Sequence, residues 1–273
     1  MSVMRQRQGR PDSATRMAVS KRFGMYKKEE KVGVRKAEIK EDQTLGKFSK
    51  IWRKVFQQDK GMDQDIGRLH SALSRLLKRI EYSHKDVEKF SLMLADFPLE
   101  EDMPGEAGLF LSALINNGKD SDYVVHAEPF GQIDILGFRN RKSITLKGNG
   151  GVWIGTEMKG GKLIVEGDVD DEIGGGMRGG KILVKGNSGS AGDHMKGGEI
   201  MIEGNAGAVG NFMEGGRIIV KGNATLQVGD FMEGGEIVIE GEISSIEDEI
   251  FGSIEDNVNH GKIYHKGKLI VDK

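Results

Sequence analysis

The C-terminal half of the chain repeats one pattern of apolar and polar positions about every 18 residues. Each repeat has a Met, a glycine pair starting two positions later, three apolar residues, a charged residue and another glycine. The Met residues are spaced by 19, 18, 18 and 19 positions, at Met158, Met177, Met195, Met213 and Met232. This period is too short for a helical hairpin. It fits one coil of a β-helix, in which each coil buries its apolar face against its neighbours.

Glycine and asparagine recur at the predicted corners of the coils. The second glycine of each pair stands at Gly161, Gly180, Gly198, Gly216 and Gly235. Glycine suits corners because a tight coil turns through positive φ, where a Cβ is costly. An Asn follows the strand in most coils, and stacking would bring these side chains into one ladder; they are Asn149, Asn187, Asn205 and Asn223, with Asp168 in one coil.

Coil length varies at only one corner. The segment from the strand-end glycine to the first glycine of the next coil is 7, 7, 6, 6 and 7 residues long, and the other segments are constant. Solenoids tolerate insertions at one corner, whereas a left-handed hexapeptide helix needs multiples of six. The sequence therefore predicts a right-handed parallel β-helix of about six coils of 18–19 residues. It disfavours a left-handed-helix acyltransferase.

Alternation along the strands assigns side chains to the two faces. The Met column and the aliphatic residues on either side of the outward position are predicted to fill the core. One outward column alternates in sign from coil to coil, which we interpret as control of register; it contains Lys147, Glu166, Lys185, Glu203, Lys221 and Glu240. A second outward column is apolar, and an interface is expected at Ile164, Leu183, Met201, Ile219 and Val238. Either the N-terminal helices or another subunit is expected to cover it.

The N-terminal part of the chain has a different periodicity. Residues 1–45 are polar and charged and predict a basic, flexible arm. Helical spacing of apolar residues over 46–57, 62–81, 83–97 and 106–116 predicts a helical cap region at 46–120, ahead of the β-helix at 124–273. In the first of these helices, Trp52 and Phe56 belong to an apolar stripe among lysines and arginines. This stripe packs on the protein itself, fits a partner groove or meets an anionic membrane surface.

Composition limits the chemistry of the chain. It has 273 residues, 41 glycines and no cysteine, which excludes disulfides, Cys-ligated metal clusters and a Cys nucleophile. No apolar stretch is long enough to span a membrane, and no export signal is seen, so a cytoplasmic location is expected.

Charge is distributed unevenly along the chain. Residues 1–60 carry 17 Lys and Arg against 7 Asp and Glu, whereas residues 61–273 carry 23 against 35. A basic arm on an acidic body suggests an anionic partner, such as nucleic acid or an anionic surface, or an acidic surface of this or another subunit.

No catalytic constellation stands out. The six histidines lack metal-ligand spacing, and His194 falls in a repeat column whose other members are Glu157, Gly176, Phe212 and Phe231. Residues 174–179 match G-x-G-x-x-G, but strands are predicted on both sides, so the match is not a dinucleotide-binding turn. No catalytic, cofactor-binding or metal residue is predicted.

The repeat resembles a known family. The run VGNFMEGGRIIVKGNA at residues 209–224 is similar to the GXGXG repeat, which is found in one of the subunits of formylmethanofuran dehydrogenase and in the C-terminal domain of the glutamate synthase large subunit. The resemblance covers residues 143–242 and is closer to the dehydrogenase repeat. It implies a right-handed β-helix that acts as a non-catalytic scaffold. The long basic N-terminal segment departs from the family pattern.

The resemblance also implies partners. Larger catalytic subunits would dock on this chain, one carrying a molybdenum or tungsten pterin and another an amidohydrolase site, within an oxidoreductase complex. A glutamate-synthase-type domain protein, with a flavin- and iron–sulfur-bearing partner, is the alternative. A stand-alone adaptor whose basic arm binds nucleic acid or an anionic surface is a third hypothesis.

Overall fold

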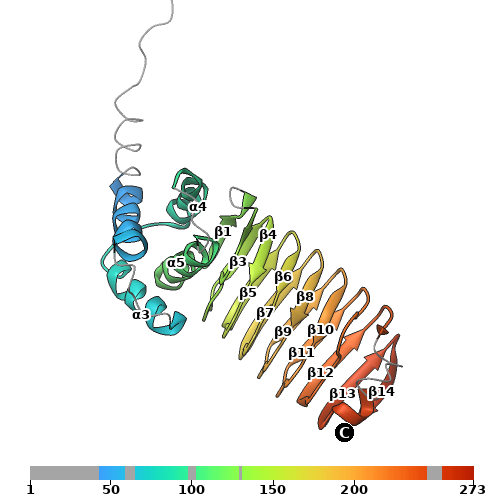
Figure 1. Cartoon of the computed structure of the whole chain (residues 1–273). Coiled ribbons are helices and arrows are strands. Elements are labelled where there is room, and N and C mark those ends of the chain that lie inside the picture. The colour runs from blue at the N-terminus through green and yellow to red at the C-terminus, as the bar shows by residue number, and fades with distance from the viewer. Residues whose placement is uncertain (1–42, 59–64, 98–102, 129–130, 245–253) are drawn as a thin grey trace, which may run out of the picture. The chain divides into compact units, whose positions relative to one another are not determined.

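The structure, a computed structural model, describes residues 43–58, 65–97, 103–128, 131–244 and 254–273. Thr44–Lys273 forms one compact unit of helices followed by a β-solenoid (Figure 1). The predicted arm at residues 1–45 lies almost entirely outside the described residues. The parallel β-helix predicted from the repeat period is confirmed, with about six turns between residues 122 and 239.

Two of the helices begin at side chains that cap their first backbone N–H groups. Residues 43–52 are helical and continue into a π-helical turn, η1 (Arg53–Gln58). Asp65 caps α3 (Ile66–Leu77) by accepting a hydrogen bond from the N–H of Arg68 at 3.0 Å. Ser83 and Asp86 form a capping box at the start of α4 (His84–Met93), which runs into the 3₁₀ turn η2 (Leu94–Asp96). The helix expected over residues 62–81 is shorter than predicted, because it ends at Leu77.

Helix α5 (Met103–Asn117) is the centre of the helical region. Its apolar residues are buried on all sides, as expected for a helix packed between other elements; they include Ala107, Leu109, Phe110, Leu111, Leu114 and Ile115. It contacts α3, α4 and strand β2 (Gln132–Ile133). A Cβ on Gly108 would lie only 1.7 Å from the carbonyl oxygen of Asp134, so this glycine lets the helix touch the first coil. The hydroxyl of Ser112 accepts from the N–H of Gly137 at 2.9 Å and fastens the contact.

The solenoid has two sheets, parallel apart from the last strand pair of the larger one, and the first eleven strands alternate between them along the chain. The larger sheet contains, in order, β1 (Asp122–His126), β3 (Ser143–Lys147), β5 (Lys159–Val165), β7 (Gly179–Val184), β9 (Glu199–Ile202), β11 (Arg217–Val220), β12 (Glu233–Ile239), β13 (His260–His265) and β14 (Lys268–Asp272). The smaller sheet contains β10 (Ala206–Val209), β8 (Ser188–Ala191), β6 (Val169–Asp171), β4 (Asn149–Val152) and β2. β14 pairs antiparallel with β13 and ends the stack, next to the short helix α6 (Ile254–Asn257).

The solenoid starts one coil earlier than the repeat motif indicates. The sequence places the first repeat near Ser143, but β1 pairs in parallel register with β3, and β2 with β4. This first coil lacks the motif because Asn140 stands where later coils have Met. The amide of Asn140 bonds the backbone of Lys142 through both its oxygen and its nitrogen, and so stabilises the corner locally.

The interior is filled by the residues that the alternation predicted. All five repeat Met residues are fully buried. The aliphatic residues of the larger sheet's inward columns are at most 2% exposed; they are Ile144, Leu146, Leu163, Val165, Ile182, Val184, Ile200, Ile202, Ile218, Val220, Ile237 and Ile239. The Met column therefore closes the core, as expected, and the described coils enclose a packed interior.

The methyl groups of Met177, Met195, Met213 and Met232 each pack under a glycine of the next coil. A Cβ on Gly198 would lie 2.6 Å from Cε of Met177, and one on Gly216 would lie 2.7 Å from Cε of Met195. These glycines also have left-handed backbones, with φ of +100° and +98°. The position thus needs glycine twice, for its φ and for the space that Met occupies.

The predicted Asn ladder is present. In every step, a side-chain oxygen accepts a hydrogen bond from the backbone N–H at the same corner of the next coil. The donor–acceptor pairs are Asp168 to Asn149 at 3.0 Å, Asn187 to Asp168 at 2.7 Å, Asn205 to Asn187 at 2.9 Å, Asn223 to Asn205 at 2.8 Å and Glu242 to Asn223 at 2.8 Å. The ladder satisfies corner N–H groups that would otherwise lack a protein partner.

The alternating charge column forms ion pairs between coils. The Oε1 atom of Glu166 lies 2.8 Å from Nζ of Lys147 and 3.3 Å from Nζ of Lys185. Nζ of Lys221 lies 3.3 Å from Oε1 of Glu203. All of these side chains are about a third exposed or more, so each pair adds little to stability. Their main effect is on register, because a slip by one coil would bring like charges together.

We expect Gly216→Ala to destabilise the solenoid by about 3 kcal/mol. The alanine would have to keep a left-handed φ, and its methyl group would collide with Met195. Gly160→Ala is the matched control, because nothing lies within 4 Å of a Cβ there. It should change the free energy of unfolding by less than about 0.5 kcal/mol. Urea denaturation of both variants measures the difference, and equal destabilisation would refute this account of the glycine pair.

His70 predicts a pH dependence of stability. Its ring lies against Phe138 and its Nε2 is 3.1 Å from Nδ2 of Asn116. Burial, helped by the charge of Arg139, lowers the pKa of His70 to about 4, although a hydrogen bond with the backbone of Ser112 opposes the shift. The folded pKa is below the ordinary 6.5, so the stabilisation is complete above pH 6.5 and is lost as pH falls towards 4.

Between pH 7 and pH 5 we therefore expect the wild type to lose about 2 kcal/mol more than His70→Gln. Gln keeps a neutral acceptor for Asn116, and the carboxylates titrate in both proteins. Denaturant unfolding at the two pH values measures the effect, and parallel losses in both proteins would contradict the assignment.

Candidate functional site

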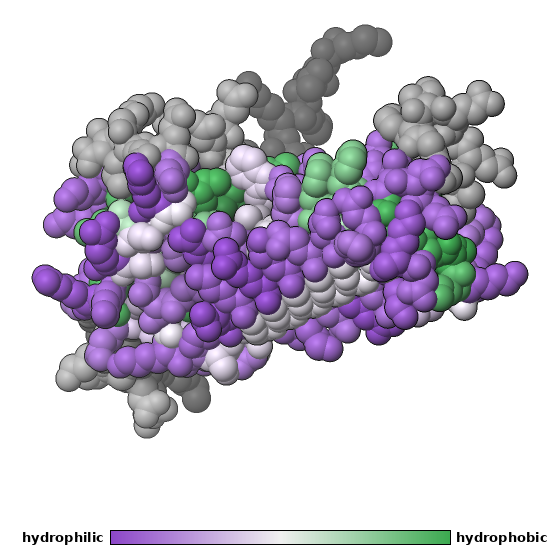
Figure 2. Space-filling model, turned by 90° about the horizontal axis from the view of Figure 1, so that it is seen from below, coloured by the Kyte–Doolittle hydropathy of each residue, from purple (hydrophilic) through white to green (hydrophobic). Residues whose placement is uncertain are grey.

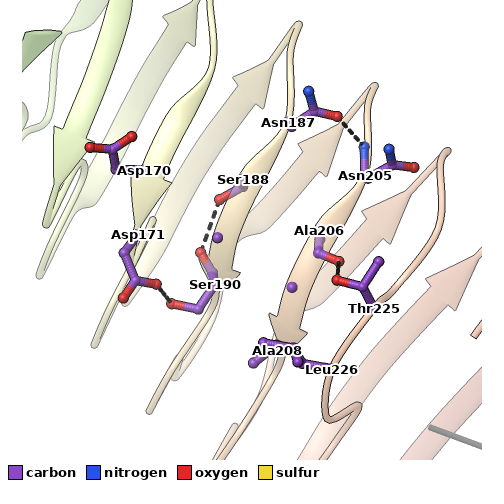
Figure 3. A pocket seen from close by; sticks show the side chains of 12 residues that line it. Asp170, Asp171, Asn187, Ser188, Ser190, Asn205, Ala206, Ala208, Thr225 and Leu226 are labelled. Atoms are coloured by element: carbon purple, nitrogen blue, oxygen red, sulfur yellow. Dashed lines mark hydrogen bonds between the residues drawn. The ribbon is translucent and has the colours of Figure 1, made fainter. Parts of the chain in front are cut away.

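The outer face of the smaller sheet carries a shallow groove. It has a volume of about 690 Å³ and crosses the strands β6, β8 and β10 (Figure 3). Its floor is made of small residues at equivalent positions of neighbouring coils, Gly189 and Ser190, then Gly207 and Ala208. Small side chains let the backbone of a partner approach the sheet closely, so the groove suits an extended segment better than a compact small molecule.

The two ends of the groove differ in chemistry. Asp170 and Asp171 lie at one end, and Thr225 and Leu226 at the other (Figure 3). The hydroxyl of Ser190 donates to the carboxylate of Asp171 and also accepts the N–H of Glu172 at 2.9 Å. Leu226 is 54% exposed and gives this end of the groove an apolar side chain. A complementary segment would therefore be basic at one end and apolar at the other.

A smaller hollow of about 210 Å³ adjoins the acidic end. Glu172, Asp193 and Asn211 line it together with Ser190 and Ala208. Burial raises the pKa of Glu172, and the carboxylates of Asp193 and Asp171 raise it further against a hydrogen bond from Trp153. Burial likewise raises the pKa of Asp193, although His194 opposes the shift. Burial and the neighbouring carboxylates disfavour the ionised forms of both groups, so a cation bound beside them would stabilise their negative charges.

Three aromatic rings stack along one corner of the solenoid. His194 lies 4.9 Å from Phe212, and Phe212 lies 5.2 Å from Phe231, both with an interplanar angle of 14°. All three residues have left-handed φ values between +52° and +55°. Glu157 and Gly176, which share their repeat column, also have positive φ. The column predicted for His194 is thus confirmed, and its ring is a stacking partner of Phe212.

The residues predicted to form an interface fall into two groups, the apolar outward column of the larger sheet and the pair Trp52 and Phe56 in the first helix. Four members of the apolar outward column are partly exposed, and Ile219 is 9% exposed. The main contacts of α4 and α5 with the solenoid are with β1 and β2. In the part of the chain that the structure describes, these helices therefore lie at the first coil rather than over the apolar column.

Trp52 and Phe56 are buried inside the helical region. Trp52 is 1% exposed and packs against Phe56, Phe97 and Phe110. The apolar stripe of the first helix is therefore used within this chain, which is the first of its three interpretations.

The groove of the smaller sheet was not predicted from the sequence. The strands of the smaller sheet lie in the segment between the strand-end glycine and the first glycine of the next coil. This segment varies in length and sequence from coil to coil, so its residues do not form a repeat motif. The one available signal is the recurrence of small residues two and three positions after the ladder Asn, at 189–190 and 207–208.

The surface of the described residues is mostly hydrophilic in the view of Figure 2, with small hydrophobic patches. Among these residues, no group of three or more His, Asp and Glu side chains is arranged to hold a metal ion. None of the described helices is long and apolar enough to cross a membrane.

The fold and the groove define a β-solenoid repeat protein with a shallow groove on the outer face of its smaller sheet. A scan against protein-family models finds no match for the chain, and a search of curated proteins finds none either.

Proposed function

We propose that the protein is a non-catalytic structural subunit that docks larger catalytic subunits. The observation that carries the proposal is the packed interior of the solenoid. Met and aliphatic side chains fill the space between the two sheets, so partners have to be met on the outside. A rigid rod with flat, regular faces is suited to positioning other subunits.

The resemblance of the repeat supports a more specific version of the proposal. The protein would act like the GXGXG-repeat subunit of formylmethanofuran dehydrogenase, within an oxidoreductase complex whose molybdenum or tungsten pterin belongs to a partner. The alternative is a glutamate-synthase-type domain protein, whose partner would carry flavin and iron–sulfur clusters. The metal and flavin content of the isolated complex distinguishes the two.

The groove on the smaller sheet is the best candidate for the docking site. Small residues on its floor allow close approach of a partner backbone, and Asp170 and Asp171 give one end a negative charge. A partner segment with a Lys or Arg at one end and an apolar residue at the other would match Asp171 and Leu226.

We expect the tagged protein to co-purify with larger subunits from its native host, and Ala208→Arg to abolish this association. The arginine would fill the groove floor, where only small side chains are present. Ala95→Arg is the matched control, because Ala95 is exposed in η2 and does not line the groove. Quantitative mass spectrometry of the co-purified proteins measures the effect. Isolation of the wild type without any larger subunit would refute the scaffold proposal.

A second function, binding of an anionic polymer or surface through the arm, is favoured by one observation. Residues 1–60 carry 17 basic against 7 acidic residues. Several contacts with phosphates would make the affinity fall steeply with salt.

Deletion of residues 2–40 tests this second function. We expect the full chain to bind single-stranded RNA or vesicles with anionic lipids at about 50 mM salt, and to lose about 100-fold or more in affinity at about 200 mM. The deletion should abolish binding. Fluorescence anisotropy or vesicle co-sedimentation measures it, and unchanged binding after deletion would exclude the arm.

A further inference from the structure

The outer face of the larger sheet has three parallel columns of side chains. The middle column is the apolar one, and its central members are Leu183, Met201, Ile219 and Val238. A charged column runs along each side of it. The column on the N-terminal side of the strands contains Lys181, Glu199, Arg217 and Glu236, and the one on the C-terminal side contains Lys185, Glu203, Lys221 and Glu240.

The two charged columns alternate in the same phase. We call the two charges that flank one apolar residue a row. The row on β7 is doubly positive and that on β9 doubly negative, and β11 and β12 repeat the alternation. On these four strands the face is therefore crossed by bands of charge, each running along a strand. On either side of them, β13 adds a doubly positive row, Lys262 and Lys266, and β5 a mixed row, Lys162 and Glu166.

The stability of a single chain does not require that the two charges of a row have the same sign. Ion pairs between neighbouring coils need only a change of sign from one coil to the next within each column. Such pairs join Lys181 and Glu199 at 3.0 Å, and Arg217 and Glu236 at 2.7 Å. Two columns in opposite phase would pair equally well along the stack, and every row would then be neutral. The charged side chains also remain available, since Lys181 is 67% exposed and Arg217 is 48% exposed.

We propose that this face binds a second copy of the chain, with the two solenoids antiparallel. A two-fold axis that runs along the strand direction between β9 and β11 reverses the order of the coils. The β9 row then faces the β11 row of the other copy, and the β7 row faces the β12 row. On these four strands each doubly positive row meets a doubly negative one, so all eight of their charges find opposite charges across the interface. At the outer rows β5 faces β13, where Glu166 meets Lys266 and Lys162 meets Lys262.

The apolar column fits the same arrangement. Met201 lies opposite Ile219 of the second copy, and Leu183 lies opposite Val238. Two sheets that pack face to face are about 10 Å apart, so these side chains would meet at the centre while the charged rows flank them. An interface with an apolar centre and a charged rim is typical of specific protein association.

The charges select this arrangement over a parallel one. A two-fold axis along the solenoid would place every row opposite the same row of the other copy, and like charges would meet on all four strands. Like-charge contacts across an interface oppose association strongly. The proposal is independent of the proposed scaffold function, which uses the smaller sheet.

The test uses full-length chains and two charge-reversed variants. Variant A carries K181E and K185E, and variant B carries E236K and E240K. In a dimer of A, the β7 row is negative and meets the negative β12 row; in a dimer of B, both rows are positive. Mixing A with B restores opposite charges in these rows without changing either folded chain.

We expect the wild type to be a dimer at micromolar concentration in sedimentation equilibrium and to weaken as salt rises. Each variant alone should dissociate about 100-fold more easily, and the mixture should form an A–B dimer, seen by native mass spectrometry with one variant isotope-labelled. A wild type that stays monomeric at about 100 µM, well above the dissociation constant of a specific dimer, would overturn the proposal. Variants that dimerise as well as the wild type, or absence of the A–B dimer, would do so too.

A second pair of variants covers the case in which reversed rows disturb folding. Met201→Arg places a charge at the apolar centre and should make the protein monomeric. Ala208→Arg, the groove variant on the smaller sheet, should leave the dimer intact. Thermal unfolding by circular dichroism checks that both remain folded. If Met201→Arg stays dimeric, or if Ala208→Arg also becomes monomeric, the interface does not lie on this face.

Discussion

The contact between a Met methyl group and a glycine of the next coil sets the geometry of the solenoid from Met177 to its C-terminal end. Gly216, with φ of +98°, sits above Cε of Met195, and the same contact recurs at Gly198 and Gly235. It fixes the corner conformation and the height of one coil above another. The larger sheet, the Asn ladder and the charge columns all depend on that repeated spacing, because each links equivalent positions of neighbouring coils.

Because the interior is packed with side chains, only the outer surface of the solenoid is left for binding other molecules. The two sheet faces differ in character, because the larger one presents long charged and apolar side chains and the smaller one presents Gly, Ala and Ser. The charged face is suited to a matching flat surface, and the small-residue face with Asp170 and Asp171 to an extended segment. The two proposals therefore concern separate surfaces, and the protein could hold a partner while it is paired with its own copy.

Much of the fold could be predicted from the sequence because five copies of one motif give the same assignment of inward and outward positions, which a single short strand would leave ambiguous. The inward columns, the buried Met residues and the Asn ladder follow from one motif repeated five times. The motif does not mark the first coil, since Asn140 replaces the Met and uses its own amide to stabilise the corner. The strand periodicity alone placed the start of the β-helix at 124, inside β1. The candidate groove was missed, because its residues belong to the corner where the coils vary in length and no motif marks them.

The sequence by itself determined the class of fold, the side of each strand that faces the core, and the alternation of charge from coil to coil. These are properties of local periodicity, which a single strand already expresses. Only the tertiary structure decided that α5 docks on the first coil through Gly108 and Ser112 and that Trp52 is an internal residue. The tertiary structure also placed Asp171 beside the small residues of later coils. Those features depend on contacts between segments that are distant along the chain, where helical and strand periodicity carry no information.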